Sequence, residues 1–233
     1  MPVRNFAAGG VVRTAVGLAD TPGAMTYVAF VSFGTVAGSQ WMIARHNASH
    51  ASAGSWAGLG REPEIHFYPA GQDAGFTCPT GEWVLVAAVK AAGSSKANYY
   101  YYRFATGTWS SAESTLAYTS AYAGAPAEFQ LGRWNNTEQF TGRYAAAMVF
   151  DRVLSEAEVK DLVNVGAMTD WLGLGPKALW TFDQQSVGES VKDITGNGAD
   201  QTTIEGTTVL EEEPPIPYRA LRPGTRDLLG VGR

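Results

Sequence analysis

Short apolar runs, separated by glycine, proline and polar residues, follow one another along most of the chain. Met25–Phe33 is an almost uninterrupted apolar and aromatic run, which is typical of a strand buried on both faces. Trp83–Lys90 is a further apolar run and is also expected to be a strand. In Glu64–Tyr68 the apolar and polar residues alternate, so Ile65 and Phe67 should face one side of a sheet. The pattern therefore predicts β-strands as the main element.

The remaining strands are shorter and are predicted from the same pattern. We expect them at Trp41–Arg45, Tyr99–Phe104, Glu128–Gly132 and Tyr144–Phe150. Val3–Gly17 is expected to pair with a sheet edge, and the Ala, Ser and Gly content of His46–Gly60 predicts a loop. Turn signals about every ten residues between short strands indicate a sandwich or jelly roll.

One helix is predicted directly after Tyr144–Phe150. Ser155 and Glu158 have the spacing of a capping box, and Leu154 and Val159 are placed for a hydrophobic staple. Val159, Leu162 and Val163 would form an apolar stripe, and Gly166 would end the helix.

This stretch also carries a resemblance to a known family. Gly142, an apolar strand, Phe150-Asp151-Arg152, Leu154-Ser155 and Glu158-Val159 follow one another over about twenty-five residues. The order resembles the closing motif of laminin-G-like jelly rolls, which belong to the concanavalin A-like lectin and glucanase superfamily. The resemblance implies an all-β, laminin-G-like sandwich with one short α-helix.

A second motif stands late in the chain. Ala178–Asp183, Val191–Asp193 and Gly196–Asp200 resemble the opening motif of the same family. Too few residues follow for another jelly roll, so we interpret the chain as circularly permuted, because the ends of a sandwich often lie close together. Residues 1–210 would form the jelly roll, with the family's first strand supplied by about 178–209, and residues 211–233 would be a linker and an arm.

Composition narrows the function classes. The chain has 233 residues, 45% of them hydrophobic, and a net charge of −5, which argues against a nucleic-acid surface. Cys78 is the only cysteine, so no internal disulfide can form. The N-terminus lacks the apolar region of a secretion signal, and no run is long enough to span a bilayer. We expect a chain made and folded in a cytoplasm, with no membrane insertion.

Catalysis is not expected, although glucanases share this fold. Retaining glycosidases need two carboxylates about 5 Å apart. The Glu-x-Glu pairs are Glu62/Glu64, Glu156/Glu158 and Glu211/Glu213. Glu62/Glu64 has Pro63 between its members and no third acid after it. Glu156/Glu158 is expected in the first turn of the helix, where acids are favourable, and Glu211/Glu213 is expected in the linker.

Metal sites are predicted to be absent, with one alternative left open. His46 and His50 have helical zinc-ligand spacing, but their neighbours favour a loop. Asp193, Asn197 and Asp200 could supply oxygen ligands to calcium. The same residues can bond their own backbone as an Asx-type turn, which we favour. No cofactor is expected.

Aromatic residues are the remaining candidates for a binding site. Trp134 with Asn135 and Asn136 combines a ring with amides, as stacking on a sugar requires. Alternate tyrosines of Tyr99–Tyr102 must point away from the core, so Tyr100, Tyr102 and Trp109 are further candidates. Packing of these rings under loops or against a partner chain is the alternative.

The C-terminal segment differs in composition from the rest. An acidic run leads into a proline-rich stretch and then a basic arm. The predicted docking residues are Pro214, Pro215, Pro217, Tyr218, Arg219, Arg222 and Arg226. Docking on a neighbouring subunit is one interpretation, and a flexible tail is the other.

The permuted order, the lack of a secretion signal and the proline-rich exit are similar to minor tail proteins of phages that infect actinobacteria. The resemblance implies a non-enzymatic virion protein, with other virion proteins and further copies of itself as partners. Its jelly roll would decorate the particle and touch host cell-wall glycans. The alternatives are a free bacterial carbohydrate-binding module and, less favoured, a glycoside hydrolase.

Overall fold

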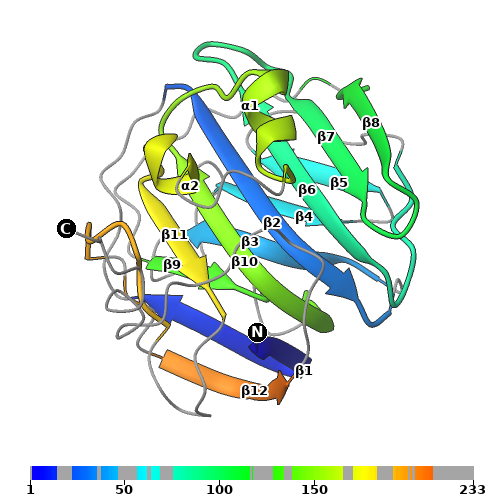
Figure 1. The fold of residues 1–233 in the computed structure, drawn as a ribbon, viewed down its shortest axis with the longest axis vertical. Helices are drawn as coiled ribbons and strands as arrows, with labels where there is room; N and C mark the ends of the chain where they lie inside the picture. The colour runs from blue at the N-terminus through cyan, green and yellow to red at the C-terminus, as the bar shows by residue number, and fades with distance from the viewer. Residues whose placement is uncertain are drawn as a thin grey trace, which may run out of the picture.

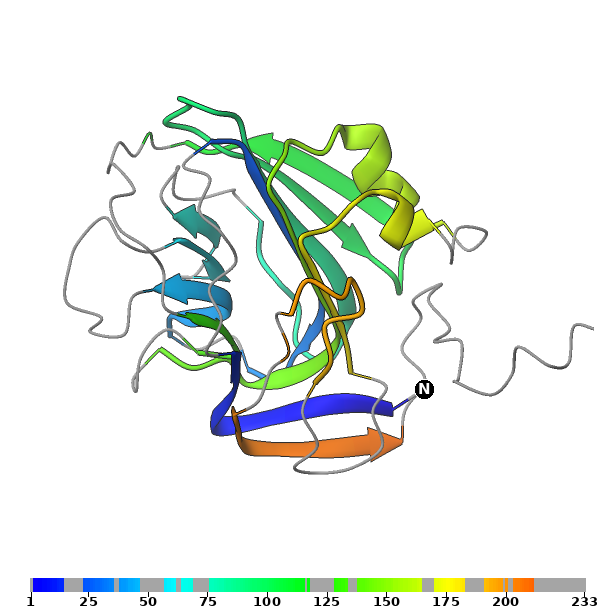
Figure 2. The ribbon, with the colours of Figure 1, turned by 90° about the vertical axis from the view of Figure 1, so that its left-hand side faces the viewer.

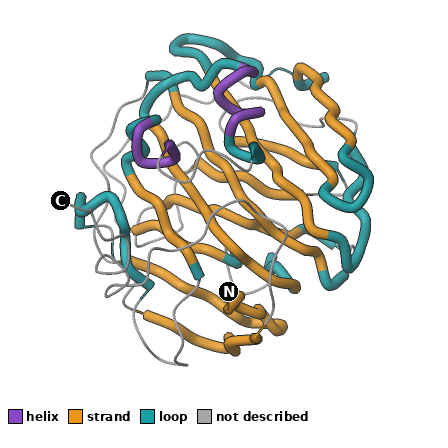
Figure 3. The backbone as a smooth tube through the Cα atoms, viewed as in Figure 1, coloured by secondary structure: helices purple, strands orange, loops and turns teal. Residues whose placement is uncertain are grey.

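The structure, a computed structural model, describes residues 2–14, 23–35, 38–46, 57–61, 64–68, 76–115, 117, 128–133, 138–164, 170–182, 191–198, 200 and 203–211. Strands make up most of this part of the chain (Figure 3). The strands are β1 (Pro2–Thr14), β2 (Met25–Phe33), β3 (Gln40–His46), β4 (Ala57–Arg61), β5 (Ile65–Tyr68), β6 (Trp83–Lys90), β7 (Asn98–Arg103), β8 (Thr108–Glu113), β9 (Glu128–Leu131), β10 (Gly142–Phe150), β11 (Ala178–Thr181) and β12 (Thr203–Glu211). The helices are α1 (Glu156–Asp161) and α2 (Asp170–Gly173).

Two antiparallel layers face each other across a core. The front sheet has the order β8-β7-β6-β2-β10, and β11 also pairs with β10; the back sheet has the order β5-β4-β3-β9. Figure 1 shows α1 and α2 in front of the front sheet, and Figure 2 shows the two layers from the side. The architecture is the sandwich that the strand pattern predicts.

β1 joins the two layers. Arg4–Phe6 pairs with β10 of the front sheet, whereas Val12–Thr14 pairs with β9 of the back sheet. The register of its pairing with β12 shifts between Phe6 and Val11. β1 therefore lies between strands on both sides, and one of its partners is the outer strand β12, in keeping with the expectation that this segment pairs with a sheet edge.

The late segments add strands to the body of the sandwich. β11 pairs with β10, with Trp180 opposite Ala147, and β12 pairs along β1 from Pro2↔Glu211 to Arg13↔Thr203. Trp180 is fully buried, and its ring centroid lies 6.0 Å from that of Phe129 in the back sheet. Residues near Trp180 thus join the same sheet as the first strand. Residues 212–233 lie outside the described residues, so the linker and the arm stay predictions.

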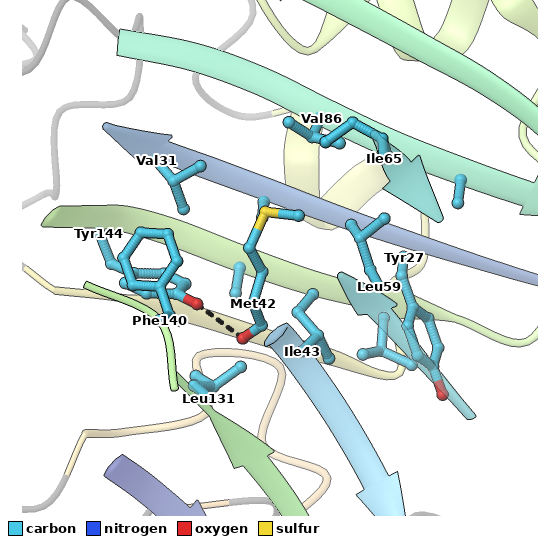
Figure 4. Packing of buried hydrophobic residues seen from close by; sticks show 14 of the residues in the cluster. Tyr27, Val31, Met42, Ile43, Leu59, Ile65, Val86, Leu131, Phe140 and Tyr144 are labelled. Atoms are coloured by element: carbon cyan, nitrogen blue, oxygen red, sulfur yellow. Dashed lines mark hydrogen bonds between the residues drawn. The ribbon is translucent and has the colours of Figure 1, made fainter. Parts of the chain in front are cut away.

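The inner core fills the space between the sheets. Figure 4 shows side chains from both layers meeting there, among them Val31 and Val86 from the front sheet and Met42 and Leu131 from the back sheet. The Tyr144 hydroxyl donates to the backbone oxygen of Met42 over 2.7 Å, so the buried phenol has an acceptor.

A second core lies on the outer face of the front sheet, under the helices. Phe30 stacks on Trp171 of α2 with ring centroids 4.9 Å apart. Val159 and Leu162 are fully buried there, and Val163 packs against the same cluster, as the predicted stripe requires. The helices therefore cover part of this face with apolar side chains.

The start of α1 confirms the predicted capping box. Ser155 accepts from the Glu158 backbone nitrogen, and the Glu158 side chain accepts from the Ser155 backbone nitrogen. The preceding turn is fixed to β2, because Thr26 Oγ1 donates to the Arg152 carbonyl and accepts from the Leu154 backbone nitrogen. The helix ends at Asp161, and Gly166, the predicted stop, lies outside the described residues.

Four sequence expectations need correction. The predicted loop His46–Gly60 overlaps two strands: its last residues belong to β4, which starts at Ala57, and His46 is the last residue of β3. Glu211, assigned to the linker, ends β12. α2 is a second short helix where only one was expected. β4 forms despite its glycines because β3 and β5 flank it on both sides.

Candidate functional site

The tyrosine-rich strand β7 divides its side chains between the two faces of the front sheet. Tyr99 and Tyr101 belong to the inner core, whereas Tyr100 and Tyr102 pack partly buried on the outer face. This confirms the predicted alternation. Trp109 of β8 also lies on the outer face, so the structure brings together the three aromatic candidates of this region.

Pairing between β7 and β8 sets these residues in rows. The outer-face pairs are Tyr102↔Trp109, Tyr100↔Ser111 and Asn98↔Glu113. Together these six residues form what we term the β7–β8 platform. Asn98, Ser111 and Glu113 are exposed, and the three aromatic side chains are half-buried.

One end of the platform is aromatic. The ring centroids of Tyr102 and Trp109 are 4.8 Å apart, and those of Tyr102 and Phe104 are 5.0 Å apart in an edge-to-face arrangement. Phe104 in turn lies 6.2 Å from Phe30. The cluster is thereby fixed to the outer core, and part of its ring surface stays accessible.

The other end is a polar hollow beside the start of α1. Its volume is about 290 Å³, and its wall includes Asn98, Tyr100, Ser111, Glu113 and Glu156. This volume is just below the range of about 300–1,000 Å³ that is usual for small-molecule sites.

Charge in the hollow is balanced by two lysines outside it. Lys96 Nζ lies 2.7 Å from Glu113 Oε2, and Lys160 Nζ lies 2.6 Å from Glu156 Oε1. Burial raises the pKa of the Tyr100 phenol, and the Glu156 carboxylate raises it further. The phenol is therefore a protonated donor at neutral pH.

The platform combines an apolar ring surface with donors and acceptors a few ångströms away. Exposed rings can stack on the apolar face of a flat ligand, and carboxylate, amide and hydroxyl groups can bond its polar rim. Such a combination suits a small, hydroxyl-rich molecule better than a purely apolar one.

The described ends of the loop that carries the other aromatic candidate lie away from the platform. Trp134, Asn135 and Asn136 lie outside the described residues. In the segment that connects β9 to β10, Arg133 and Gln139 on either side of them form an antiparallel β-bridge with each other. β2 and β6 separate β10 from β7. The bases of this loop and the platform therefore belong to different parts of the sandwich.

The calcium candidates are engaged in a turn. Asp193 Oδ1 accepts from the backbone nitrogens of Leu179 and Thr195 over 3.1 and 3.0 Å. Asp200 accepts from the Asp193 backbone nitrogen and from Lys192, which lowers the pKa of its carboxyl. Asn197 Nδ2 donates to the Lys177 carbonyl. These contacts match the Asx-type turn, and within the described ranges no group of three or more His, Cys, Asp or Glu is arranged to hold a metal ion.

The predicted carboxylate pairs fall in different settings. Glu156 and Glu158 lie in the first turn of α1, as expected, and Glu158 is bonded to Arg152 and Ser155. Glu62 and Glu213 lie outside the described residues, as do His50 and all the arm residues, Pro214, Pro215, Pro217, Tyr218, Arg219, Arg222 and Arg226. Neither described helix has the length and apolar character needed to cross a membrane.

Several platform residues escaped sequence reasoning. Asn98, Ser111 and Glu113 share the outer face with Tyr100 through the pairing of β7 and β8, and recognising Thr108–Glu113 as a strand would have found them. Glu156 has no such signal, because only the packing of α1 on the front sheet brings it to the hollow.

Comparisons with known proteins bear on the fold. No family model matches the sequence, and the comparison with curated proteins gave no match. The structure is similar to a candidate carbohydrate-binding protein from Bacteroides ovatus, with a TM-score of 0.57 and 15% identity, over 92% of this chain and 61% of that one. This chain thus spans less than two thirds of the length of that protein.

Two further solved structures score lower. A heptameric pentraxin from Limulus polyphemus gives a TM-score of 0.48 at 10% identity, covering 89% of this chain and 94% of that one. The LG1-3 region of the laminin α2 chain gives 0.46 at 11% identity, covering 67% and 32%. Sheet order and the Bacteroides ovatus structure together establish the fold: the chain is a concanavalin A-like, laminin-G-like jelly-roll sandwich.

Proposed function

We propose that this jelly roll is a non-enzymatic, glycan-binding module and that the β7–β8 platform is its binding surface. The observation that carries the proposal is the row of three cross-strand pairs, Tyr102↔Trp109, Tyr100↔Ser111 and Asn98↔Glu113. A sugar ring stacked on Trp109 would place its hydroxyls near the polar hollow. The description of the Bacteroides ovatus neighbour as carbohydrate-binding is consistent with this use of the fold.

Lack of catalysis is part of the proposal. Glu113 and Glu156 flank the hollow, but each is paired with a lysine. Glycosidases that retain configuration need one carboxyl kept protonated as the acid and a second as the nucleophile. The hollow is therefore better suited to holding a sugar than to cleaving one. Incubation of the bound glycan with the protein should release no new reducing ends.

A glycan array followed by calorimetry on the best ligand tests the binding surface. Trp109→Ala should weaken binding about tenfold, because stacking contributes about 0.5–1.5 kcal/mol beyond buried area. Tyr100→Phe removes only the hydroxyl and should weaken it less. Val153→Ala, at an exposed position before α1, is the matched control and should leave binding unchanged.

The variant Trp134→Ala shows whether the glycan binds to the platform or to the loop that contains Trp134. If Trp134→Ala abolishes binding while Trp109→Ala keeps it, the site is the loop between β9 and β10. Each variant must keep the melting temperature of the parent, since a lower value would report damage to the fold. An array on which the parent protein binds no glycan would contradict the proposal as a whole.

For the biological setting, we propose a component of a phage particle, in the tail or on its surface. Support comes from the strand order, in which β12 pairs with β1, and from the proline-rich exit that follows β12 in the sequence. These are the features that resemble minor tail proteins. A free bacterial carbohydrate-binding module is the alternative.

Mass spectrometry of purified particles distinguishes the two settings. The chain should be present in particles at a fixed copy number, and deletion of Pro214–Arg233 should leave a soluble, folded jelly roll that no longer assembles. Incorporation of the shortened chain would contradict a docking role for the arm. A chain found only on the bacterial cell wall would favour the free module.

A further inference from the structure

Among the described strands, β8 is the last strand at one end of the front sheet. In the hydrogen-bonded order of the described strands, β8 pairs with β7 on one side and with no strand on the other. Thr108, Ser111 and Glu113 of this strand are exposed. An edge of this kind presents backbone donors and acceptors to which another strand can pair.

The ladder shows which residues direct their backbone groups outward. Ser114 N donates to Ala97 O over 2.9 Å in the same register as the β7–β8 pairs. In an antiparallel ladder, hydrogen-bonded and non-hydrogen-bonded pairs alternate. Ala112, Ser110 and Thr108 therefore bond to β7. Trp109, Ser111 and Glu113 direct their N–H and C=O groups away from it.

Two other outer strands, β5 and β12, carry features that discourage pairing, and β8 does not. β5 has only four residues, and Pro63 and Pro69 flank it closely in the sequence. β12 contains Glu205 and Glu211 and is followed by further glutamates and prolines. Proline, charge and short length are the usual means of protecting an edge. β8 has six residues without proline, and its one charge, Glu113, is paired with Lys96.

We propose that β8 pairs antiparallel with the β8 of a second copy about a two-fold axis at Ser111. Directly opposed residues in a sheet have their side chains on the same face, and neighbouring residues in a strand point to opposite faces. If the outer faces of both copies are to lie on the same side, a residue must therefore oppose its own copy, and the two-fold axis passes beside one residue and not between two. Centring on Ser111 places Trp109 opposite Glu113 of the other copy and uses all three outward-directed residues, for about six backbone hydrogen bonds. No like charges then oppose each other directly.

This pairing also extends the binding surface. The platforms of the two copies become one continuous surface, and Trp109 of each copy lies beside Glu113 of the other, at the hollow. A second copy thus supplies an aromatic wall to the polar end of each site. The inference concerns the strand edge and stands whether or not a glycan binds.

Sedimentation of the full chain at several concentrations tests the dimer. The parent should be a dimer at micromolar concentration, and Ser111→Ala should remain one. Ser111→Pro removes an outward N–H, which edge strands tolerate, and Ser111→Lys places two charges opposite each other at the axis. Both should shift the dimerisation constant at least tenfold toward monomer. A monomeric parent at all concentrations would overturn the proposal.

Cysteine cross-linking tests the register. In a hydrogen-bonded pair the Cα atoms are about 5.5 Å apart, which a disulfide can span, so Ser111→Cys should form a covalent dimer on mild oxidation. In the same register Ser110 lies diagonally from its copy, about 7–8 Å away, so Ser110→Cys should stay monomeric on a denaturing gel. The buried Cys78 should not interfere. Cross-linking of Ser110→Cys in place of Ser111→Cys would refute the Ser111 axis.

Discussion

Arg152 Nη2 lies 2.8 Å from Glu158 Oε1, so the turn before α1 is bonded to the first turn of the helix that it starts. Glu158 Oε2 also accepts from the Ser155 backbone nitrogen over 2.8 Å. The hydrogen bond from Arg152, followed by that from Ser155, lowers the pKa of Glu158 to about 2. One carboxylate thus fixes both the cap of α1 and its approach to the sheet.

Glu158→Gln should lower the free energy of unfolding by about 1 kcal/mol at pH 7, after allowance for solvent screening. Glutamine keeps the capping geometry, so the loss reports the charge. Because the folded pKa is depressed, this stabilisation is complete above the unfolded pKa of about 4.3 and is lost as the pH falls toward 2. Urea titrations of parent and variant at pH 7, 4 and 2.5 should converge at the lowest pH. Glu156→Gln, which breaks a more exposed pair with Lys160, should cost less.

Gly142 begins β10 at a φ of 150°, and a Cβ there would collide with the Ser32 carbonyl oxygen and lie 2.9 Å from the Gly34 backbone nitrogen. The first of these atoms belongs to the backbone of β2 and the second to the residue directly after it. Neither can move without breaking the β2–β10 ladder. Gly142→Ala should therefore destabilise the fold by about 2–4 kcal/mol. Gly23→Ala is the control, since nothing lies within 4 Å of its added Cβ. Equal melting temperatures for the two variants would show that β10 can shift.

Trp180 tests the contribution of the late strands. Its side chain is fully buried between the sheets, so Trp180→Ala should cost about 3–5 kcal/mol. Leu172→Ala, at a position 48% exposed on α2, should cost less than 1 kcal/mol. Chemical denaturation followed by circular dichroism measures both. A small loss for Trp180→Ala would mean that β11 adds little to the core that the rest of the chain forms.

Cys78 offers a probe of opening. Burial raises the pKa of its thiol to about 12, against a smaller opposite effect of Arg61. The thiol should therefore react slowly with a disulfide reagent at pH 8 and rapidly in urea. Because the folded pKa is raised, ionisation of this thiol leaves the free energy of unfolding at its full value below the unfolded pKa of about 8.5. The free energy of unfolding then falls as the pH rises toward 12. Fast labelling of the native protein would place Cys78 at an accessible surface.

Features fixed by neighbouring residues could be predicted from the sequence. The capping box of Ser155 and Glu158 depends on a spacing of three, and the two faces of Tyr99–Tyr102 depend on the period of a strand. β4 could not be predicted, because Gly58 and Gly60 suit a loop until Trp41 of β3 lies across Gly58. The hollow depends on Glu156 meeting β8 through helix packing, which no local pattern encodes.

The pairing of β1 with β12 has a consequence for synthesis. Residues 203–211 are translated long after residues 2–14, by about 10–40 s at 5–20 residues per second. For that interval β1 has no β12 beside it, although its partners β9 and β10 appear earlier. Closure of the sandwich at this edge must therefore be among the final steps of folding on the ribosome, and a nascent chain stalled before Thr203 would expose the length of β1 to any other free strand.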